Sequence, residues 1–274
     1  MKLTTDTTST THSLLISDLG RVEVTVREQG HGRPLLLLHG GAGPQSVTGF
    51  ADLLAAEQDV RVITPTHPGF AGTLRPESLA NPAELAALYS ELLNRLDLDD
   101  VLVVGNSMGG WVAAEMALLG SARIGAIVLV GAVGIAVEGH PVADFFSLTM
   151  DQVFELSYHE PDLFRIDPST MPPAQQQIMA GNRAALAVYA GTQMFDPTLR
   201  SRLAAVDCPT LVLSGESDGI VDTEYGRALA DSIPGATFRV LPHTGHVPQI
   251  ETPPQLMREI MEFAPATVLE SPPL

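Results

Sequence analysis

Short, almost wholly apolar runs alternate along the chain with longer segments of helical periodicity, and this alternation constrains the fold more than any other feature of the sequence. Continuous runs of Val, Leu and Ile are typical of strands that are covered on both faces. Strands alternating with helices predict a mostly parallel sheet with helices on both faces, and the first two strands predict an antiparallel hairpin at one edge. Strands are expected at residues 14–17, 22–28, 34–39, 60–65, 101–105, 124–130, 210–214 and 237–241, and helices at 83–96, 108–119, 223–232 and 254–263.

The alternation is interrupted once, between residues 136 and 206, where no strand is predicted. Two helical patterns, at residues 142–158 and 173–195, occupy this stretch and are rich in Phe, Tyr and Met. Open α/β sheets bind ligands at the carboxyl ends of their strands, so a helical insertion after the sixth strand predicts a cap over a site at that edge. The expected organisation is an α/β core at residues 1–135 and 204–274, a helical cap at 136–203, and loose tails at 1–12 and 265–274.

Composition excludes several classes of protein. The 274 residues carry a formal net charge of −17, and such an acidic chain lacks the basic face that nucleic-acid binding requires. The single cysteine, Cys208, cannot close a disulfide within the chain. The longest apolar stretch, residues 124–137, is shorter than the roughly 20 residues of a membrane-spanning helix, and residues 1–13 lack the apolar segment of a secretory signal. We therefore expect a cytoplasmic protein that acts on a small molecule, with no membrane or nucleic-acid partner.

The expected strand at residues 101–105 runs directly into Gly105-Asn106-Ser107-Met108-Gly109, and a helical pattern follows at once. A G-x-S-x-G sequence between a strand and a helix is typical of a strained turn that exposes the serine hydroxyl at the edge of the sheet. Ser107 is therefore the candidate nucleophile. The N–H of Met108 would lie at a helix N-terminus, where it can stabilise a developing oxyanion.

A serine nucleophile needs a base, and the base is held in turn by an acid. In this architecture the acid and the histidine follow the serine in that order. Asp218 follows the seventh expected strand and is the candidate acid, with Glu216 and Asp222 as alternatives. His246 follows the last strand, and we assign it as the base in preference to His243, because a glycine precedes it and helps the loop to place it.

The third expected strand ends in His39-Gly40-Gly41-Ala42-Gly43-Pro44. Glycines at this point allow backbone N–H groups to face the site, which predicts a second oxyanion donor from Gly41 or Ala42. His39 itself comes too early in the chain to be the base, and we interpret it as a structural residue.

Cofactor and metal motifs are incomplete in this chain. The glycines after the third strand lack the third glycine of a dinucleotide-binding fingerprint, and Trp111 stands where a phosphate-binding loop carries lysine. The spacing His243-x-x-His246 has no third metal ligand to accompany it. We therefore expect neither a cofactor nor a metal.

Taken together, these segments resemble the α/β-hydrolase superfamily over nearly the whole chain. The resemblance implies the α/β-hydrolase fold, with an eight-stranded, mostly parallel sheet, helices on both faces and a helical cap inserted after strand 6. Within the superfamily, the GNSMGG and HGGAGP segments resemble serine hydrolases of the meta-cleavage-product type, which split carbon–carbon bonds in ring-fission dienones. The matching segments are LLLLHGGAGP, VITPTHPGFAGT, VLVVGNSMGGW, LVLSGESDGIVD and HTGHVPQIETP.

Several positions depart from that pattern. Val247 follows the candidate base where the carbon–carbon hydrolases usually carry Trp, and Thr66 stands where many relatives carry Asp. The resemblance implies a cap arginine that binds the substrate carboxylate, for which Arg165 and Arg183 are the candidates. His67 is unusual at its position, and we interpret it as a residue that packs the loop.

The sequence therefore predicts a serine hydrolase in which Ser107 attacks a carbonyl, His246 acts as base and then as acid, and Asp218 orients the imidazole. Because the expected cap is rich in Phe and Met, a small or medium apolar carboxylic ester is the preferred substrate. The alternative is a carbon–carbon bond hydrolase of the meta-cleavage type. A ligand-binding protein that keeps this fold without turnover is the alternative from another class.

Overall fold

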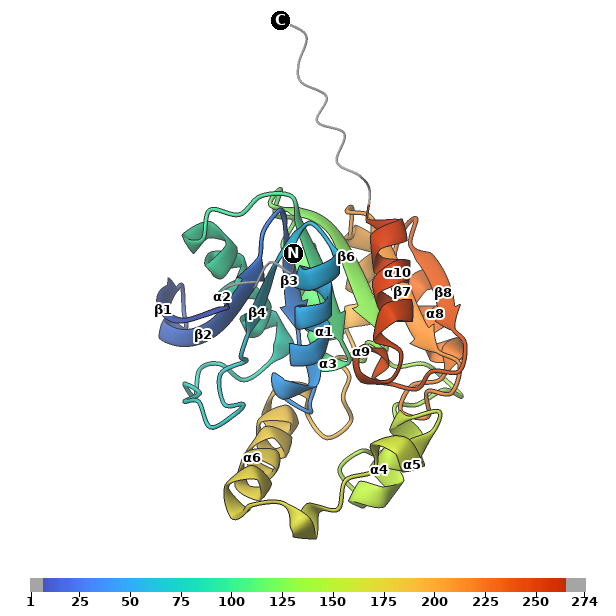
Figure 1. Cartoon of the computed structure of the whole chain (residues 1–274). Coiled ribbons are helices and arrows are strands. Elements are labelled where there is room, and N and C mark those ends of the chain that lie inside the picture. Colours follow the sequence, from blue (N-terminus) through green and yellow to red (C-terminus); the bar gives the residue numbers. More distant parts are fainter. Residues whose placement is uncertain (1–6, 265–274) are drawn as a thin grey trace, which may run out of the picture.

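The computed structural model describes residues 7–264, whose strands form one eight-stranded sheet (Figure 1). The order across the sheet is β1-β2-β4-β3-β5-β6-β7-β8. β1 pairs antiparallel with β2 and β2 with β4, and the later neighbours are parallel, which confirms the predicted fold class and the edge hairpin. The strands are β1 Thr8–Ile16, β2 Gly20–Gly30, β3 Arg33–Leu38, β4 Val60–Pro65, β5 Val101–Asn106, β6 Ile124–Val130, β7 Thr210–Gly215 and β8 Thr237–Leu241.

The first strand is longer than the sequence predicts. β1 begins at Thr8, so the expected loose segment is wrong for residues 8–12, which pair with β2 from Thr8↔Glu28 onward. These residues show no apolar alternation because most of their side chains are exposed. Threonine nevertheless favours strands, and the long partner β2 supplies the backbone hydrogen bonds. Residues 1–6 and the tail expected at 265–274 lie outside the described residues.

Two hydrophobic cores lie on opposite faces of the sheet. Along β3, Leu36 and Leu38 enter one core while Leu35 and Leu37 enter the other, which explains the continuous apolar run. Helices α2, α3 and α8 contribute to the first core, and α1 and α10 to the second (Figure 1). No helix within the described residues is long and apolar enough to cross a membrane. The helices of this part are α1 Gln45–Glu57, α2 Pro82–Arg95, α3 Met108–Leu118, α8 Thr223–Asp231, α9 Pro248–Glu251 and α10 Pro253–Phe263.

Helix α1 is absent from the helices that the sequence predicts. Its buried face nevertheless includes Val47, Phe50 and Leu54, whose spacing of three and four residues is the helical period. Pro44 occupies the N-cap position, so the loop of the candidate oxyanion donors runs directly into α1.

The insertion, residues 136–203, stands beyond one edge of the sheet, with α6 on one side and α4 and α5 on the other (Figure 1). α4 is shorter than the expected helix at 142–158, because Thr149 and Gln152 form a capping box that starts it at Met150. α6 ends before residue 195 because Gly191 adopts a φ of 65°. The helices and 3₁₀ turns of the insertion are α4 Met150–Ser157, α5 Pro161–Phe164, η1 Pro168–Thr170, α6 Pro173–Ala190, α7 Leu199–Arg202 and the adjoining η2 Leu203–Ala205.

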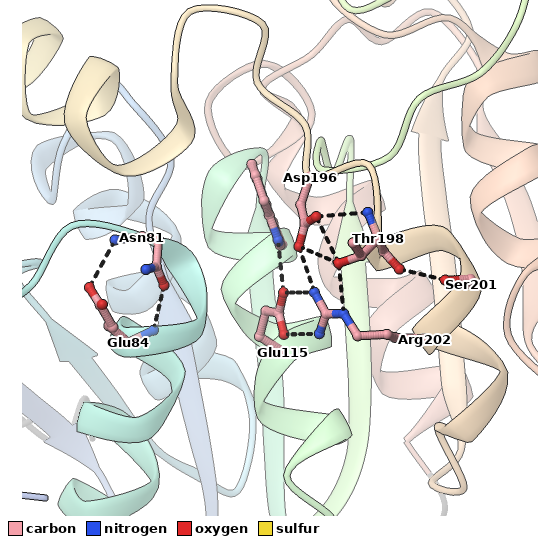
Figure 2. Close-up of polar contacts among 8 residues, drawn as sticks. Asn81, Glu84, Glu115, Asp196, Thr198, Ser201 and Arg202 are labelled. Carbon is pink, nitrogen blue, oxygen red and sulfur yellow. Dashed lines mark hydrogen bonds and ion pairs between the residues drawn. The ribbon is translucent and has the colours of Figure 1, made fainter. Parts of the chain in front are cut away.

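An ion-pair network joins the end of the insertion to helix α3 (Figure 2). Arg202 donates to both carboxylate oxygens of Glu115 at 2.7 Å and to Asp196 at 2.8 Å. The Glu115 side chain is only 6% exposed and also accepts from Trp111 Nε1 at 3.3 Å. Because α3 begins immediately after Ser107, the network fixes the insertion to the helix that carries the candidate nucleophile.

We expect Arg202→Met to lower the free energy of unfolding by about 3 kcal/mol, because it leaves the Glu115 carboxylate buried without its cation. Adding Glu115→Gln should recover part of that loss, since a neutral amide is less costly to bury. Urea unfolding measures both effects. Arg200→Met, at a neighbouring exposed arginine, is the control and should change stability by less than about 0.5 kcal/mol. Equal losses in Arg200→Met and Arg202→Met would contradict the interpretation.

Candidate active site

Ser107 lies at a strained turn between β5 and α3, with φ 55° and ψ −119°. A Cβ at Gly105 would lie 2.1 Å from the carbonyl oxygen of Gly109, and one at Gly109 would lie 2.4 Å from that of Leu38. Only glycine fits at both positions, so the G-x-S-x-G spacing follows from backbone contact. The turn leaves Ser107 partly exposed while its neighbours on both sides are buried.

Asp218 and His246 contact each other directly. Asp218 Oδ2 lies 2.8 Å from His246 Nδ1, and the two side chains are 0% and 8% exposed respectively. The other carboxylate oxygen accepts from the N–H groups of Ile220 at 2.9 Å and Val221 at 3.0 Å. Because Asp218 accepts a hydrogen bond from Nδ1 of His246, the proton of the neutral imidazole lies on Nδ1. Nε2 is then unprotonated and available to receive a proton.

The alternative acids and the alternative base lie elsewhere. Glu216 accepts from the backbone N–H of His243 at 2.9 Å, and His243 is largely exposed. Asp222 caps α8 through Tyr225 N at 2.8 Å and lies 2.7 Å from His140 Nδ1. Asp218 is thus the carboxylate that contacts His246, and its catalytic role stays a prediction.

Asn106 connects the turn at Ser107 to the histidine loop, a link that the sequence reasoning missed. Its Nδ2 donates to the carbonyl of His246 at 3.0 Å and to that of Val130 at 3.2 Å. Its Oδ1 accepts from Gln249 Nε2 at 3.1 Å. Asn106 thus bridges the end of β5, directly before Ser107, and the backbone of His246. The signal in the sequence was the polar residue immediately before the serine.

The candidate oxyanion donors lie on the two segments beside Ser107. A Cβ at Gly40 would lie 3.0 Å from Ser107 Cβ, so the loop that carries Gly41 and Ala42 passes directly alongside the serine. Met108 is the first residue of α3, and the N–H groups of a first helical turn have no acceptor within the helix. The roles of Gly41, Ala42 and Met108 as oxyanion donors stay predictions.

The insertion contacts both halves of this site. Leu186 of α6 packs against Gly41, where an added Cβ would lie 2.5 Å from Leu186 Cδ2. The carbonyl of Ser157, at the end of α4, accepts from the backbone N–H of His246 at 2.8 Å. Movement of α6 would therefore disturb the oxyanion side, and movement of α4 the histidine side.

Glu251 strengthens the contact between the insertion and the histidine loop, and the sequence did not indicate this role. Its carboxylate accepts from Gly245 N at 2.6 Å, from His159 N at 2.7 Å and from Glu160 N at 3.1 Å. One side chain thus holds the residue before His246 and two residues of the insertion.

The two candidate arginines occupy different environments. Arg165, whose side chain is 30% exposed, binds the carboxylates of Asp151 and Glu155. Arg183 lies on α6, one helical turn before Leu186, with its guanidinium carbon 4.9 Å from the ring centre of Phe145. Within the described residues its hydrogen bonds come from Nη2 alone, which donates to the carbonyls of Phe145 at 3.0 Å and Phe146 at 2.8 Å.

His39 and His67 form a buried pair at the start of the candidate oxyanion loop, residues 40–43, and contact neither Asp218 nor His246. Their ring centres lie 3.8 Å apart, and His67 also accepts a hydrogen bond from the hydroxyl of Tyr89. Burial lowers the pKa of His67 to about 4. Burial, together with the neighbouring His67, holds the pKa of His39 well below its ordinary value.

The low pKa of His67 predicts a stability that falls on acidification. The unfolded chain binds the proton near pH 6.5 and the folded chain only near pH 4, so the contribution is present above pH 6.5 and is lost between those values. The slope is about 1.4 kcal/mol per pH unit. We expect the difference in unfolding free energy between wild type and His67→Gln to shrink by about 2 kcal/mol from pH 6.5 to pH 5 in urea titrations. A difference that is constant with pH would contradict a neutral, buried His67.

The contact between Asp218 and His246 predicts that Asp218→Asn keeps the fold and loses nearly all activity, by on the order of 10⁴ in kcat, because an amide favours the wrong imidazole tautomer. Glu216→Gln is the matched control, since its carboxylate contacts only the His243 region. Hydrolysis of p-nitrophenyl acetate measures both variants. A larger loss in Glu216→Gln would show that the acid is misassigned.

Comparison with known proteins places the chain in a family. Residues 35–259 match the model of the Alpha/beta hydrolase family, so the chain belongs to that family and is an α/β-hydrolase enzyme. This confirms the resemblance that the sequence motifs indicate.

Two curated relatives and one solved structure are similar over most of their lengths. The chain is 27% identical to the 2-hydroxy-6-oxo-6-(2'-aminophenyl)hexa-2,4-dienoic acid hydrolase of Metapseudomonas resinovorans, over 89% of this chain and 88% of that protein. It is 29% identical to the 2-hydroxy-6-oxo-2,4-heptadienoate hydrolase of Pseudomonas putida, over 90% and 94%. A thermophilic esterase from Thermogutta terrifontis is 26% identical with a TM-score of 0.74, over 92% of this chain and 97% of that one.

Proposed function

We propose that this enzyme is a serine hydrolase in which Ser107 is the nucleophile, His246 the base and Asp218 the acid that orients it. The observation that carries the proposal is the buried contact of 2.8 Å between Asp218 and His246, on loops that Asn106 ties to the turn at Ser107. In this arrangement Nε2 of His246 takes the hydroxyl proton and later returns it to the leaving group. The N–H groups of Met108 and of Gly41 or Ala42 stabilise the oxyanion, and the insertion acts as the cap.

We further propose that the substrate is a 2-hydroxy-6-oxo-2,4-dienoate and that the bond cleaved is the carbon–carbon bond beside the 6-oxo group. The sequence alone placed ester hydrolysis first. The curated relatives favour the alternative, because proteins named for hydrolysis of such dienoates match about nine-tenths of the chain.

Cleavage of such a bond demands more than cleavage of an ester. C5 of the dienoate is a vinyl carbon, and a vinyl carbanion is a poor leaving group. Transfer of the 2-hydroxyl proton to C5 gives a 2-oxo acid, from which C5 can leave as a dienolate once oxygen has added to C6. Water completes the reaction, and the products are a 2-hydroxydienoate and the carboxylic acid derived from C6.

This chemistry requires a cation for the substrate carboxylate, and Arg183 is the arginine whose position fits. It lies one turn from Leu186, which packs against Gly41, whereas the guanidinium of Arg165 is already paired with the carboxylates of Asp151 and Glu155. A charge-assisted hydrogen bond to a carboxylate contributes roughly 1.5–3 kcal/mol.

The test compares a dienoate with a 6-phenyl group against p-nitrophenyl acetate. Ser107→Ala should lower kcat for both by on the order of 10⁴ or more. Arg183→Gln keeps an N–H donor for the carbonyls of Phe145 and Phe146 but removes the charge. It should lower kcat/KM for the dienoate about 10- to 100-fold and change that for the ester by less than about threefold. Arg165→Gln is the control and should change neither.

Slower turnover of the dienoate than of the ester, with equal effects of Arg183→Gln on both, would favour the second candidate, a carboxylesterase. Two observations support that candidate: the likeness to the Thermogutta terrifontis esterase, and Val247, which puts no aromatic side chain beside His246.

A further inference from the structure

We propose that His39 and His67 are positioning residues that fix the direction of the backbone peptides in the oxyanion loop, and so aim the N–H of Gly41 at the reacting carbonyl oxygen. The inference rests on the proposed serine hydrolase but not on its substrate. Neither ring touches the substrate side of the site, because both side chains are fully buried.

The hydrogen bonds assign a single protonation pattern to the pair. His67 Nε2 lies 2.8 Å from the carbonyl oxygen of His39, and His39 Nδ1 lies 2.8 Å from that of Gly40, so both nitrogens are donors. The backbone N–H of His67 donates to His39 Nε2 at 3.1 Å, and the Tyr89 hydroxyl donates to His67 Nδ1. Each ring therefore has one donor and one acceptor nitrogen, as a neutral imidazole must.

The direction of the loop peptides is set by these bonds together with the N–H of Gly43, which donates to the Gly40 carbonyl at 3.1 Å. In a trans peptide the C=O and the following N–H point in opposite directions. The carbonyl of Gly40 is turned toward the His39 ring, so the N–H of Gly41 is turned away from the buried pair. Gly40 lies against Ser107, and the N–H of Gly41 is the next backbone group along the chain, so it is the donor that we assign to the reacting carbonyl oxygen.

Rigid elements on several sides hold the pair in place. Tyr89, whose hydroxyl donates to His67 Nδ1, comes from α2. Tyr189 of α6 donates to the carbonyl of Pro68, the residue after His67, at 2.9 Å. The histidine pair thus connects β3, the loop after β4, α2 and α6 to one stretch of backbone beside the nucleophile.

The orientation of the Gly41 N–H by the histidine pair should stabilise the transition state more than the bound substrate. The oxyanion carries its full charge only after Ser107 has attacked, so a misdirected Gly41 N–H should lower kcat and leave KM nearly unchanged. The effect should be the same for any acyl substrate, since the loop faces the carbonyl oxygen and not the rest of the molecule.

The experiment compares four variants with wild type. His67→Leu removes the donor to the His39 carbonyl. His67→Gln is the conservative variant, because its amide nitrogen can still donate there. Tyr89→Phe removes only the bond to His67 Nδ1. Phe70→Leu is the matched control, because it weakens packing around His39 without removing a hydrogen bond of the loop. Urea unfolding verifies that each variant is folded under assay conditions.

Two readouts follow, steady-state hydrolysis of p-nitrophenyl acetate and inhibition by phenylboronic acid, whose serine adduct mimics the tetrahedral intermediate. His67→Leu should lower kcat about 10- to 100-fold, change KM by less than about threefold and weaken boronate inhibition by a factor similar to the loss in kcat. His67→Gln should restore most of the loss, and Tyr89→Phe should lie between them. Phe70→Leu should lower stability and leave kcat within about threefold.

The outcomes separate this inference from the proposed function. If a fluorophosphonate does not label wild type at Ser107, the serine hydrolase itself is wrong and the inference fails with it. If Ser107 is labelled but His67→Leu and Phe70→Leu reduce kcat equally, or His67→Gln restores nothing, the histidine pair is only part of the core and the inference alone is overturned.

Discussion

The strained turn at Ser107 is the constraint on which the rest of the site depends. The turn requires α3 to start against the end of β3 and β5 so closely that no Cβ fits at Gly105 or Gly109. This close approach puts the serine beside Gly40 and the first N–H of a helix beside the serine. The candidate nucleophile and the candidate oxyanion donors are thus brought together by one backbone contact. The fold tolerates the positive φ of Ser107 that this contact requires.

The loops that carry Asp218 and His246 are positioned by buried polar contacts, because loops lack the regular backbone hydrogen bonds of helices and strands. Asp218 uses one carboxylate oxygen for two backbone N–H groups and the other for His246. Asn106 and Glu251 hold the backbone on either side of that histidine. Each of these groups is satisfied within the protein, which keeps the site rigid before any substrate arrives.

The insertion contacts the core at several places. Its return segment is fixed to α3 by the pair of Arg202 and Glu115, while α4 and α6 each contact one half of the site. Under the proposed function, chemistry at the carbonyl depends on the core loops, and the choice of substrate depends on side chains such as Arg183 that the insertion adds. The two properties can therefore vary separately, which is why the superfamily motifs identify the enzyme class more sharply than the substrate.

The sequence by itself determined where the buried strands lie along the chain and where the turn at Ser107 forms. Both signals are local, because uninterrupted apolar runs define the strands and the glycines around Ser107 define the turn. It missed α1, whose spaced apolar residues lie among glycine and polar residues, and it took residues 8–12 for a tail because a solvent-exposed strand has no apolar pattern. Only the tertiary structure decided which of three acidic residues contacts His246, that Asn106 and Glu251 support the histidine loop, and that two histidines form a buried pair at the start of the candidate oxyanion loop. These relations join residues far apart in the chain, and a hydrogen bond between distant loops leaves no periodic trace in the sequence.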